Sequence, residues 1–275
     1  MRWLLLALAA CGAQPRHTTP IDVTYLGVAG WQITEGATTI LTDPYFSRPP
    51  SFEGPIVPDP AAIAAHSPQH ADAIVIGHSH VDHLLDAPDV AKRTGAILIG
   101  SPSTIAVGAA SGLPEDKLEE VQPGDDLEFG AFSIRVIASL HSRIGMPTKQ
   151  IVTPKLPLTW NDYGDGGTLA YLIRLGGHQI LVLDTANFIE RELVGIHPDI
   201  AILAPGLREK IHDYTCRLIH VLGDPPTVLV THFDEWKKAP ADLPSEDADK
   251  LAAELHACSP NTNVIVPKHF QKLTL

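Results

Sequence analysis

Three histidines and one aspartate lie within six residues, in the run Gly77-His78-Ser79-His80-Val81-Asp82-His83. In a confined site, each such polar side chain that lacks a partner costs about 1–3 kcal/mol, so packing alone does not favour the cluster. Imidazole nitrogens and carboxylate oxygens are good ligands for Zn²⁺, whereas closed structural zinc sites are built largely from thiolates. The run therefore predicts a metal site that is open for catalysis.

Side-chain direction divides this run into two ligand pairs. In an extended loop, residues i and i+2 point the same way, so we expect His78 and His80 to bind one ion. Asp82 and His83 follow on the next turn, where we expect them to face a second ion. Local geometry thus predicts a two-metal site.

The pattern His-x-His-x-Asp-His after an apolar run resembles the motif of the metallo-β-lactamase superfamily. Further landmarks of that family match in order: Asp43 in Leu41-Thr42-Asp43-Pro44, His141 in Ser139-Leu140-His141-Ser142, Asp184 in Leu183-Asp184-Thr185 and His232 in Leu229-Val230-Thr231-His232. The resemblance implies an α/β (α+β) fold, an αββα sandwich of two mixed β-sheets flanked by helices, with the metals at one edge of the sheets. It covers roughly residues 21–275 and looks most like the lactonase and phosphodiesterase branch.

The resemblance also implies how the metal ligands are shared between two zinc ions. His78, His80 and His141 would bind one ion. Asp82, His83 and His232 would bind the other, and Asp184 would bridge the two. Asp43 would support the ligands from behind without binding metal itself. Asp82 and Asp184 are the implied catalytic carboxylates.

His269 is the main rival to His232 as the last ligand, because it also follows an apolar run, Val264-Ile265-Val266. We rank His232 first, because its surroundings look more like the family's final histidine. His269 is otherwise expected to line the pocket or to cap the last strand. An isolated histidine is more often a surface or core residue than a ligand. The remaining histidines therefore receive no role: His17, His66, His70, His178, His197, His212, His220 and His256.

The hydrophobic pattern predicts elements that carry these residues to one place. Short β-rich runs at residues 21–26, 31–34 and 38–42 predict an antiparallel meander. Residues 71–77 end in a buried strand just before the histidine cluster, and residues 84–93 after it have helical spacing. A strand at 96–99, a helix at 102–111 and strands at 132–138, 168–175 and 179–183 follow. His141, Asp184 and His232 each come directly after an apolar β-like run, so we expect all three to project from strand ends.

Residues 142–167 form a long segment with several prolines and glycines and little periodicity, a length at which loops tend to be functional. Trp160 and Tyr163 in this segment offer a stacking face, and Lys149 and Lys155 offer positive charge. Together with Trp236, the two aromatic residues are candidate substrate contacts. A merely exposed loop is the competing interpretation.

The composition favours a small substrate. The chain has 275 residues, a formal net charge of −12 and 44% hydrophobic residues. Affinity for nucleic acid comes largely from clustered Lys and Arg, so this acidic chain is not expected to bind nucleic acid. We find no Walker A motif, no G-x-G-x-x-G and no G-x-S-x-G, which leaves the competing enzyme classes without their motifs.

The first residues predict export and lipidation. A positive charge and a short apolar run end in Leu8-Ala9-Ala10-Cys11, which resembles a bacterial lipobox with Cys11 as the lipidated residue. Residues 1–20 are then a lipoprotein-type signal and tether, and residues 21–275 form the hydrolase domain. The protein would sit in the cell envelope as a peripheral membrane protein. A chain that stays in the cytoplasm is the alternative.

If Cys11 carries lipid, only Cys216 and Cys258 remain. In an oxidising compartment this pair is able to form a disulfide, and two buried thiols are the competing interpretation.

A pair of zinc ions lowers the pKa of a shared water toward ~7 and so yields a bridging hydroxide without a Ser or Cys nucleophile. We therefore predict a dinuclear-zinc hydrolase that cleaves an ester-type bond, phosphodiester or lactone, in a small substrate, with Mn²⁺ or Fe²⁺ as alternative metals. A β-lactamase or thioesterase is the first alternative; the resemblance disfavours β-lactam hydrolysis, because true β-lactamases usually lack the carboxylate bridge. An iron redox enzyme usually has a carboxylate where this chain has His80. A non-catalytic envelope metal-binding protein is the last alternative.

Overall fold

A computed structural model of the chain describes residues 18–145 and 148–275. The expected export signal and Cys11 lie outside the described residues, as does most of the tether. Residues 18–20 lead directly into the first strand, β1 (Asp22–Gly27). Within the described part of the chain, every helix is too short or too polar to cross a membrane.

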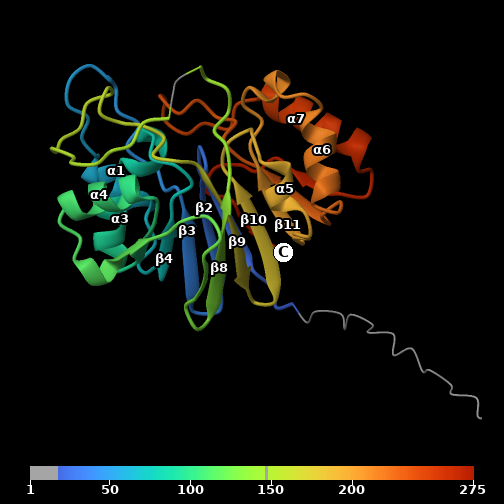
Figure 1. The fold of residues 1–275 in the computed structure, drawn as a ribbon, viewed down its shortest axis with the longest axis horizontal. Helices are drawn as coiled ribbons and strands as arrows, with labels where there is room; N and C mark the ends of the chain where they lie inside the picture. Colours follow the sequence, from blue (N-terminus) through green and yellow to red (C-terminus); the bar gives the residue numbers. More distant parts are fainter. Residues whose placement is uncertain (1–17, 146–147) are drawn as a thin grey trace, which may run out of the picture.

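Two seven-stranded sheets face each other at the centre of the domain (Figure 1). The first sheet runs, in spatial order, β14 (Lys272–Thr274), β1, β2 (Gly30–Glu35), β3 (Thr38–Thr42), β4 (Ala73–Val75), β5 (Ile97–Gly100) and β6 (Leu118–Glu120). The second runs β13 (Asn263–Ile265), β12 (Thr227–Val230), β11 (Ile200–Leu203), β10 (His178–Leu183), β9 (Leu169–Leu175), β8 (Phe132–Ala138) and β7 (Asp126–Glu128).

Helices cover the outer face of each sheet, so the layers are αββα (Figure 1). On the side of the first sheet lie α1 (Pro60–His66), α2 (Val81–Leu84), α3 (Ala87–Thr94), α4 (Pro102–Ala110) and the short 3₁₀ helix η1 (Glu115–Lys117). On the side of the second sheet lie α5 (Glu190–Leu193), the 3₁₀ helix η2 (Arg208–Lys210), α6 (Tyr214–Val221) and α7 (Glu246–Cys258).

Three apolar clusters hold these layers together. The central cluster joins the facing surfaces of both sheets, with Trp31, Ile134 and Ile173 fully buried. One outer cluster packs the first sheet against α1 to α4, and the other packs the second sheet against α5 to α7. Full burial of each large apolar side chain stabilises the fold by roughly 1.5–3 kcal/mol. Apolar contacts therefore hold each sheet on both of its faces.

The predicted αββα architecture is confirmed, including the antiparallel β1–β2–β3 meander. One element differs. The helix predicted at residues 84–93 is divided into α2 and α3, because Asp86 interrupts it and Pro88 starts a new helix in the first turn of α3. Asp86 accepts hydrogen bonds from the backbone amides of Phe46 and Ser47 instead of capping a helix. The division leaves Asp82 and His83 on a separate single turn, α2.

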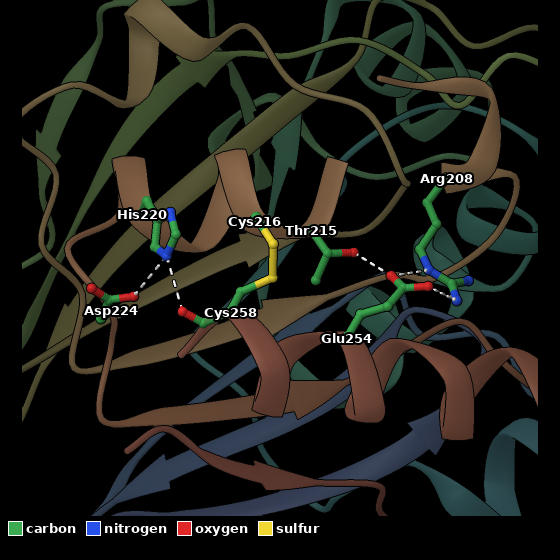
Figure 2. The surroundings of a disulfide bond; sticks show 7 residues. All are labelled: Arg208, Thr215, Cys216, His220, Asp224, Glu254 and Cys258. Carbon is green, nitrogen blue, oxygen red and sulfur yellow. Dashed lines mark hydrogen bonds and ion pairs between the residues drawn. A yellow bond between two sulfur atoms is a disulfide. The ribbon is translucent and has the colours of Figure 1, made fainter. Parts of the chain in front are cut away.

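A disulfide bond joins Cys216 of α6 to Cys258 at the end of α7 (Figure 2). This resolves the alternative between a disulfide and two buried thiols. Arg208 donates two hydrogen bonds to Glu254 of α7 beside it, both at 2.9 Å, and Thr215 of α6 bonds to the same carboxylate. The disulfide and the hydrogen bond from Thr215 to Glu254 therefore join α6 to α7, and the ion pair joins η2 to α7.

Candidate metal centre

The loop after β4 carries the first histidines past a glycine that has no room for a side chain. A Cβ atom at Gly77 would lie 2.2 Å from Oδ2 of Asp184. The Gly77 amide donates to Oδ1 of Asp43 at 2.9 Å, and its carbonyl accepts from the amide of Leu169 at 2.8 Å. Gly77 thus lets the Asp184 carboxylate lie directly against the loop, and the loop is tied to both sheets.

The second sheet supplies the remaining residues from three strand ends. His141 follows β8, Asp184 follows β10 and His232 follows β12. Strands β10, β11 and β12 are parallel, and β8 has the same direction because β9 pairs antiparallel to both β8 and β10. Their carboxyl ends therefore meet at one edge of the sheet, next to the end of β4.

The seven predicted ligands lie together at this edge, and we call them the ligand cluster: His78, His80, Asp82, His83, His141, Asp184 and His232. Their donor atoms form three groups, each with all its atoms within 4.8 Å of one another. These groups are His78 with His80 and His141, His78 with His83 and Asp184, and Asp82 with His83 and His232.

Asp184 occupies the centre of the cluster. Its Oδ2 lies 2.7 Å from Nδ1 of His78 and 3.4 Å from Nδ1 of His83. These two histidines belong to the two outer groups, so one carboxylate contacts both. Nε2 of His232 lies 3.4 Å from Oδ2 of Asp82, which closes the second group. The residues of the two ligand sets that the resemblance implies thus lie together, with Asp184 between them; which of them bind metal stays a prediction.

Buried polar atoms in the ligand cluster, and in Asp43 behind it, lack hydrogen-bond partners among the described residues. They are both ring nitrogens of His83, Oδ1 of Asp184 and Oδ2 of Asp43. An unpaired buried polar group costs about 1–3 kcal/mol, and three carboxylates packed together add repulsion. Divalent cations would satisfy the first two residues as direct ligands and offset the negative charge. The residues present therefore fit a metal centre.

Burial keeps the first histidines neutral. It lowers the pKa of His80 to about 4, and it also lowers the pKa of His78, His83 and His141. The neighbouring imidazoles lower the pKa of His78 further, because two positive charges would repel each other. Neutral imidazoles are the form that binds metal, so these side chains are ready as ligands at neutral pH.

The pKa values of Asp82 and Asp184 shift in opposite directions. Burial favours the neutral form of Asp82, but the neighbouring His83 and the hydrogen bond of His232 outweigh it and lower its pKa. Burial raises the pKa of Asp184, and the nearby His83, His141 and His232 offset this only in part. For His232, burial lowers the pKa, but the hydrogen bond and charge of Asp82 outweigh it, so the net pKa is raised. In the absence of a cation, the negative charge of Asp82 is thus balanced by the positive charge of His232 in an ion pair.

Asp43 lies behind the ligands, where the sequence analysis expected support. Besides accepting from the Gly77 amide, its Oδ1 lies 3.2 Å from Nδ1 of His83. The residue adopts a positive φ of 37° at the end of β3, and its amide donates to the carbonyl of Val75. Asp43 therefore orients both the glycine loop and an imidazole.

A hydrogen-bond network that the sequence did not reveal holds the segment around His232. Oδ1 of Asp234 accepts from the hydroxyl of Tyr25 and the amide of Val28, both at 2.8 Å. Oδ2 of Asp234 accepts from Arg48 at 2.9 Å. The Val28 carbonyl in turn accepts from the amide of His232. The one sequence signal for Asp234 as a support of this segment was its position two residues after the predicted ligand His232.

His269 belongs to this network. Its Nε2 lies 3.0 Å from Asp234 Oδ2 and its Nδ1 lies 3.0 Å from Asp242 Oδ1. His232, and not His269, lies beside Asp82 and His83. His269 therefore supports the site from behind.

A cavity of about 500 Å³ opens over the ligand cluster. The candidate substrate contacts Trp160, Tyr163 and Trp236 all line it. Ile144, from the predicted functional loop at residues 142–167, lines it as well. Leu207 and Phe233 also line it, and the sequence offered no signal for these two. Lys149 and Lys155, the expected source of positive charge, are not among the described lining residues. Lys149 instead donates to the backbone carbonyl of Asn161.

Facing mixed sheets with histidines and aspartates gathered at their common edge define the class of metallo-β-lactamase-type enzymes. A family described as beta-lactamase superfamily domain matches residues 38–233. The chain therefore belongs to the metallo-β-lactamase superfamily and is a metal-dependent hydrolase.

Individual similar proteins match nearly the whole length of this chain. The chain is 26% identical over 248 residues to a UPF0173 metal-dependent hydrolase of Methanopyrus kandleri, covering 89% of this chain and 95% of the relative. It is similar in fold to Igni18, a metallo hydrolase of Ignicoccus hospitalis, with a TM-score of 0.66, 18% identity and coverage of 94% and 99%. It is also similar to CmlA, a diiron β-hydroxylase of Streptomyces venezuelae, with a TM-score of 0.61, 16% identity and coverage of 95% and 54%. The fold alone therefore does not select the metal.

Proposed function

We propose that this chain is a dinuclear zinc hydrolase that cleaves an ester-type bond in a small substrate. The observation that carries the proposal is the position of Asp184, whose Oδ2 contacts a histidine from each of the two outer ligand groups. Such a shared carboxylate suits two ions held close together at the floor of one cavity.

Each side chain has a distinct part in this proposal. His78, His80 and His141 would hold one ion. Asp82, His83 and His232 would hold the second, and Asp184 would lie between them. A pair of divalent cations lowers the pKa of water toward neutrality and polarises the bond that is attacked.

The protein also orients its ligands and handles protons. His141 donates from Nδ1 to the carbonyl of Ser142 at 2.8 Å, which leaves Nε2 for the metal. Oδ2 of Asp82 faces Nε2 of His232 and is the carboxylate placed to accept and return a proton.

Zinc is proposed over iron because the group of His78, His80 and His141 consists of three imidazoles. Sites for oxygen chemistry commonly combine two histidines with a carboxylate, whereas three-histidine sites are typical of catalytic zinc. Hydrolysis is favoured over passive metal binding because a cavity large enough for a small molecule opens on the ligand cluster. A β-lactamase or thioesterase remains the alternative within the hydrolases.

We also propose that the protein is an envelope lipoprotein anchored through Cys11. The disulfide between Cys216 and Cys258 supports an oxidising compartment, because disulfides rarely persist in the cytoplasm. Membrane fractionation of cells that express the wild type or Cys11→Ser tests this. The wild type should sediment with membranes and the variant should not. Recovery of both in the cytoplasmic fraction would contradict the envelope assignment.

Metal analysis and a substrate panel test the hydrolase. We expect purified protein to contain zinc at about two ions per chain. We expect turnover of bis-p-nitrophenyl phosphate or of simple lactones above that of nitrocefin, with loss of activity after chelation and recovery with Zn²⁺. Iron as the only bound metal, or nitrocefin as the best substrate, would overturn the assignment.

A further inference from the structure

Two tryptophans from separate segments line one side of the cavity, and Phe52 contacts both of them; we call these three side chains the aromatic wall: Phe52, Trp160 and Trp236. The rings of Trp160 and Trp236 stack with centroids 5.7 Å apart and an angle of 13° between their planes. Phe52 meets both indoles edge-on, at 5.7 Å and 5.0 Å. Phe52 itself does not belong to the described lining and packs against the apolar core of the first sheet.

Apolar residues continue around the rest of the cavity. Ile144 and Trp160 remain 41% and 40% exposed, although they are large apolar side chains that normally gain from burial. Leu207, Phe233 and Tyr163 complete the apolar lining. A ligand that covers this surface with its own apolar group would be bound by the hydrophobic effect.

The polar part of the lining offers little free charge beside the aromatic wall. Asp82 and Asp184 would hold the metal ions, and Asp234 is paired with Arg48 and His269. Lys and Arg are absent from the described residues that line this cavity, whereas Arg143 and Lys210 line an adjoining cavity that shares His80 and His141 with it. Proteins recognise phosphate and carboxylate groups chiefly with Arg, Lys, backbone amides and metal ions. The part of a substrate that lies against the aromatic wall, away from the metals, therefore meets an apolar surface and no side-chain cation of the described lining.

We propose that the substrate is a carboxylic ester or lactone whose uncharged, apolar chain or ring lies against Trp160 and Trp236. This inference rests on the proposed hydrolase and chooses among its substrates those that carry a large apolar group. In the reaction, a water oxygen forms a bond to the acyl carbon and the carbon–oxygen bond to the leaving alkoxide breaks. The alkoxide takes up the proton that the water releases, so the products are a carboxylic acid and an alcohol.

A chain-length series of p-nitrophenyl esters tests this on the zinc-loaded protein. From acetate to hexanoate, burial of each added methylene should raise kcat/KM about fourfold. Bis-p-nitrophenyl phosphate and nitrocefin, which lack an aliphatic acyl chain, should be poorer substrates than the hexanoate. A flat series, or preference for the phosphodiester, would overturn the inference while leaving the hydrolase intact.

Variants test whether the aromatic wall causes the chain-length preference. Trp236→Ala and Trp160→Ala should each reduce the hexanoate-to-acetate ratio of kcat/KM about tenfold or more, because a large aromatic contact is lost. Val152→Ala is the matched control, since Val152 lies in the same loop, is 79% exposed and does not line the cavity. An unchanged ratio in both Trp variants would contradict the role of the wall.

Calorimetry with an unreactive ligand separates this inference from the hydrolase itself. We expect the ketone 4-phenyl-2-butanone to bind at least ten times more tightly than 2-butanone, and its affinity to fall in Trp236→Ala. Binding of this kind without hydrolysis of any ester would overturn the hydrolase and leave the apolar site standing. Equal or absent binding of the two ketones would overturn the apolar site.

Discussion

The ligand cluster and the aromatic wall lie on the same cavity but are built in opposite ways. His78, His83 and Asp184 are almost completely buried and come from the ends of strands or the turn beside them. Trp160 and Trp236 lie in loops, remain partly exposed, and contact each other and Phe52. Trp236 and Phe52 also pack against the apolar core of the first sheet.

We expect the ligand cluster to determine metal binding and turnover, and the aromatic wall to determine which substrate is preferred. The ligand cluster is tied to both sheets by backbone hydrogen bonds through Gly77 and Asp43, so changes there should alter metal binding and turnover. The aromatic wall has few polar links to the sheets, so changes there should alter the choice of substrate and leave metal content intact. The four predictions below test that division.

The largest effect is expected for Asp184→Asn. The amide keeps the shape of the side chain but removes the charge that lies between the two histidine groups. We expect kcat to fall about 10³-fold or more with an unchanged far-UV circular dichroism spectrum. Asp126→Asn is the control, since Asp126 is exposed and pairs with Arg174 far from the site. Wild-type kcat in Asp184→Asn would contradict the central role of this carboxylate.

A smaller effect is expected for Asp43→Asn, which changes support behind the ligands. Loss of charge beside Nδ1 of His83 should weaken metal affinity about 10- to 100-fold, as measured by competition with a chromophoric chelator. Asp72→Asn serves as control because Asp72 also accepts from a backbone amide, that of Thr39, outside the site. Equal metal affinity in both variants would show that Asp43 acts only on the fold.

On the aromatic wall, Phe52→Leu should have a modest effect. It removes two edge-on ring contacts, and each such pair contributes about 0.5–1.5 kcal/mol. We expect kcat/KM for the hexanoate ester to fall several-fold with normal zinc content. Loss of zinc in this variant would contradict the expectation that changes in the aromatic wall leave metal binding by the ligand cluster intact.

The smallest effect is a pH dependence of stability from His269, which supports the segment that joins the two regions. Burial lowers the pKa of His269, but its bonds to Asp234 and Asp242 outweigh burial, so its pKa is raised. A raised pKa in the folded state contributes stability that is complete below the unfolded value of about 6.5 and is lost as the pH rises through the folded value.

The Tm difference between wild type and His269→Gln should therefore shrink as the pH rises from about 6 to about 9. The comparison cancels the titration of the other histidines, which both proteins share. A Tm difference that grows with pH would contradict the sign.

Much of the ligand cluster was predictable because its signals are local. The run from His78 to His83 is contiguous, and His141, Asp184 and His232 each follow an apolar run that became a strand. The carboxyl ends of parallel strands meet at one edge of a sheet, so the order of motifs along the chain was enough to bring these residues together. The division of the predicted helix at Asp86 was missed because its carboxylate binds residues 40 positions earlier.

The amino-acid sequence carried the signals for the individual strands, the seven candidate ligands and the acidic character of the chain, because strand periodicity and motif spacing depend on neighbouring residues. The three-dimensional arrangement established that His269 supports Asp234, that Cys216 pairs with Cys258, and that Phe52 meets Trp160 and Trp236. It also decided that Lys149 lies outside the cavity lining. These outcomes depend on contacts between loops and helices distant along the chain, whose directions no local pattern encodes.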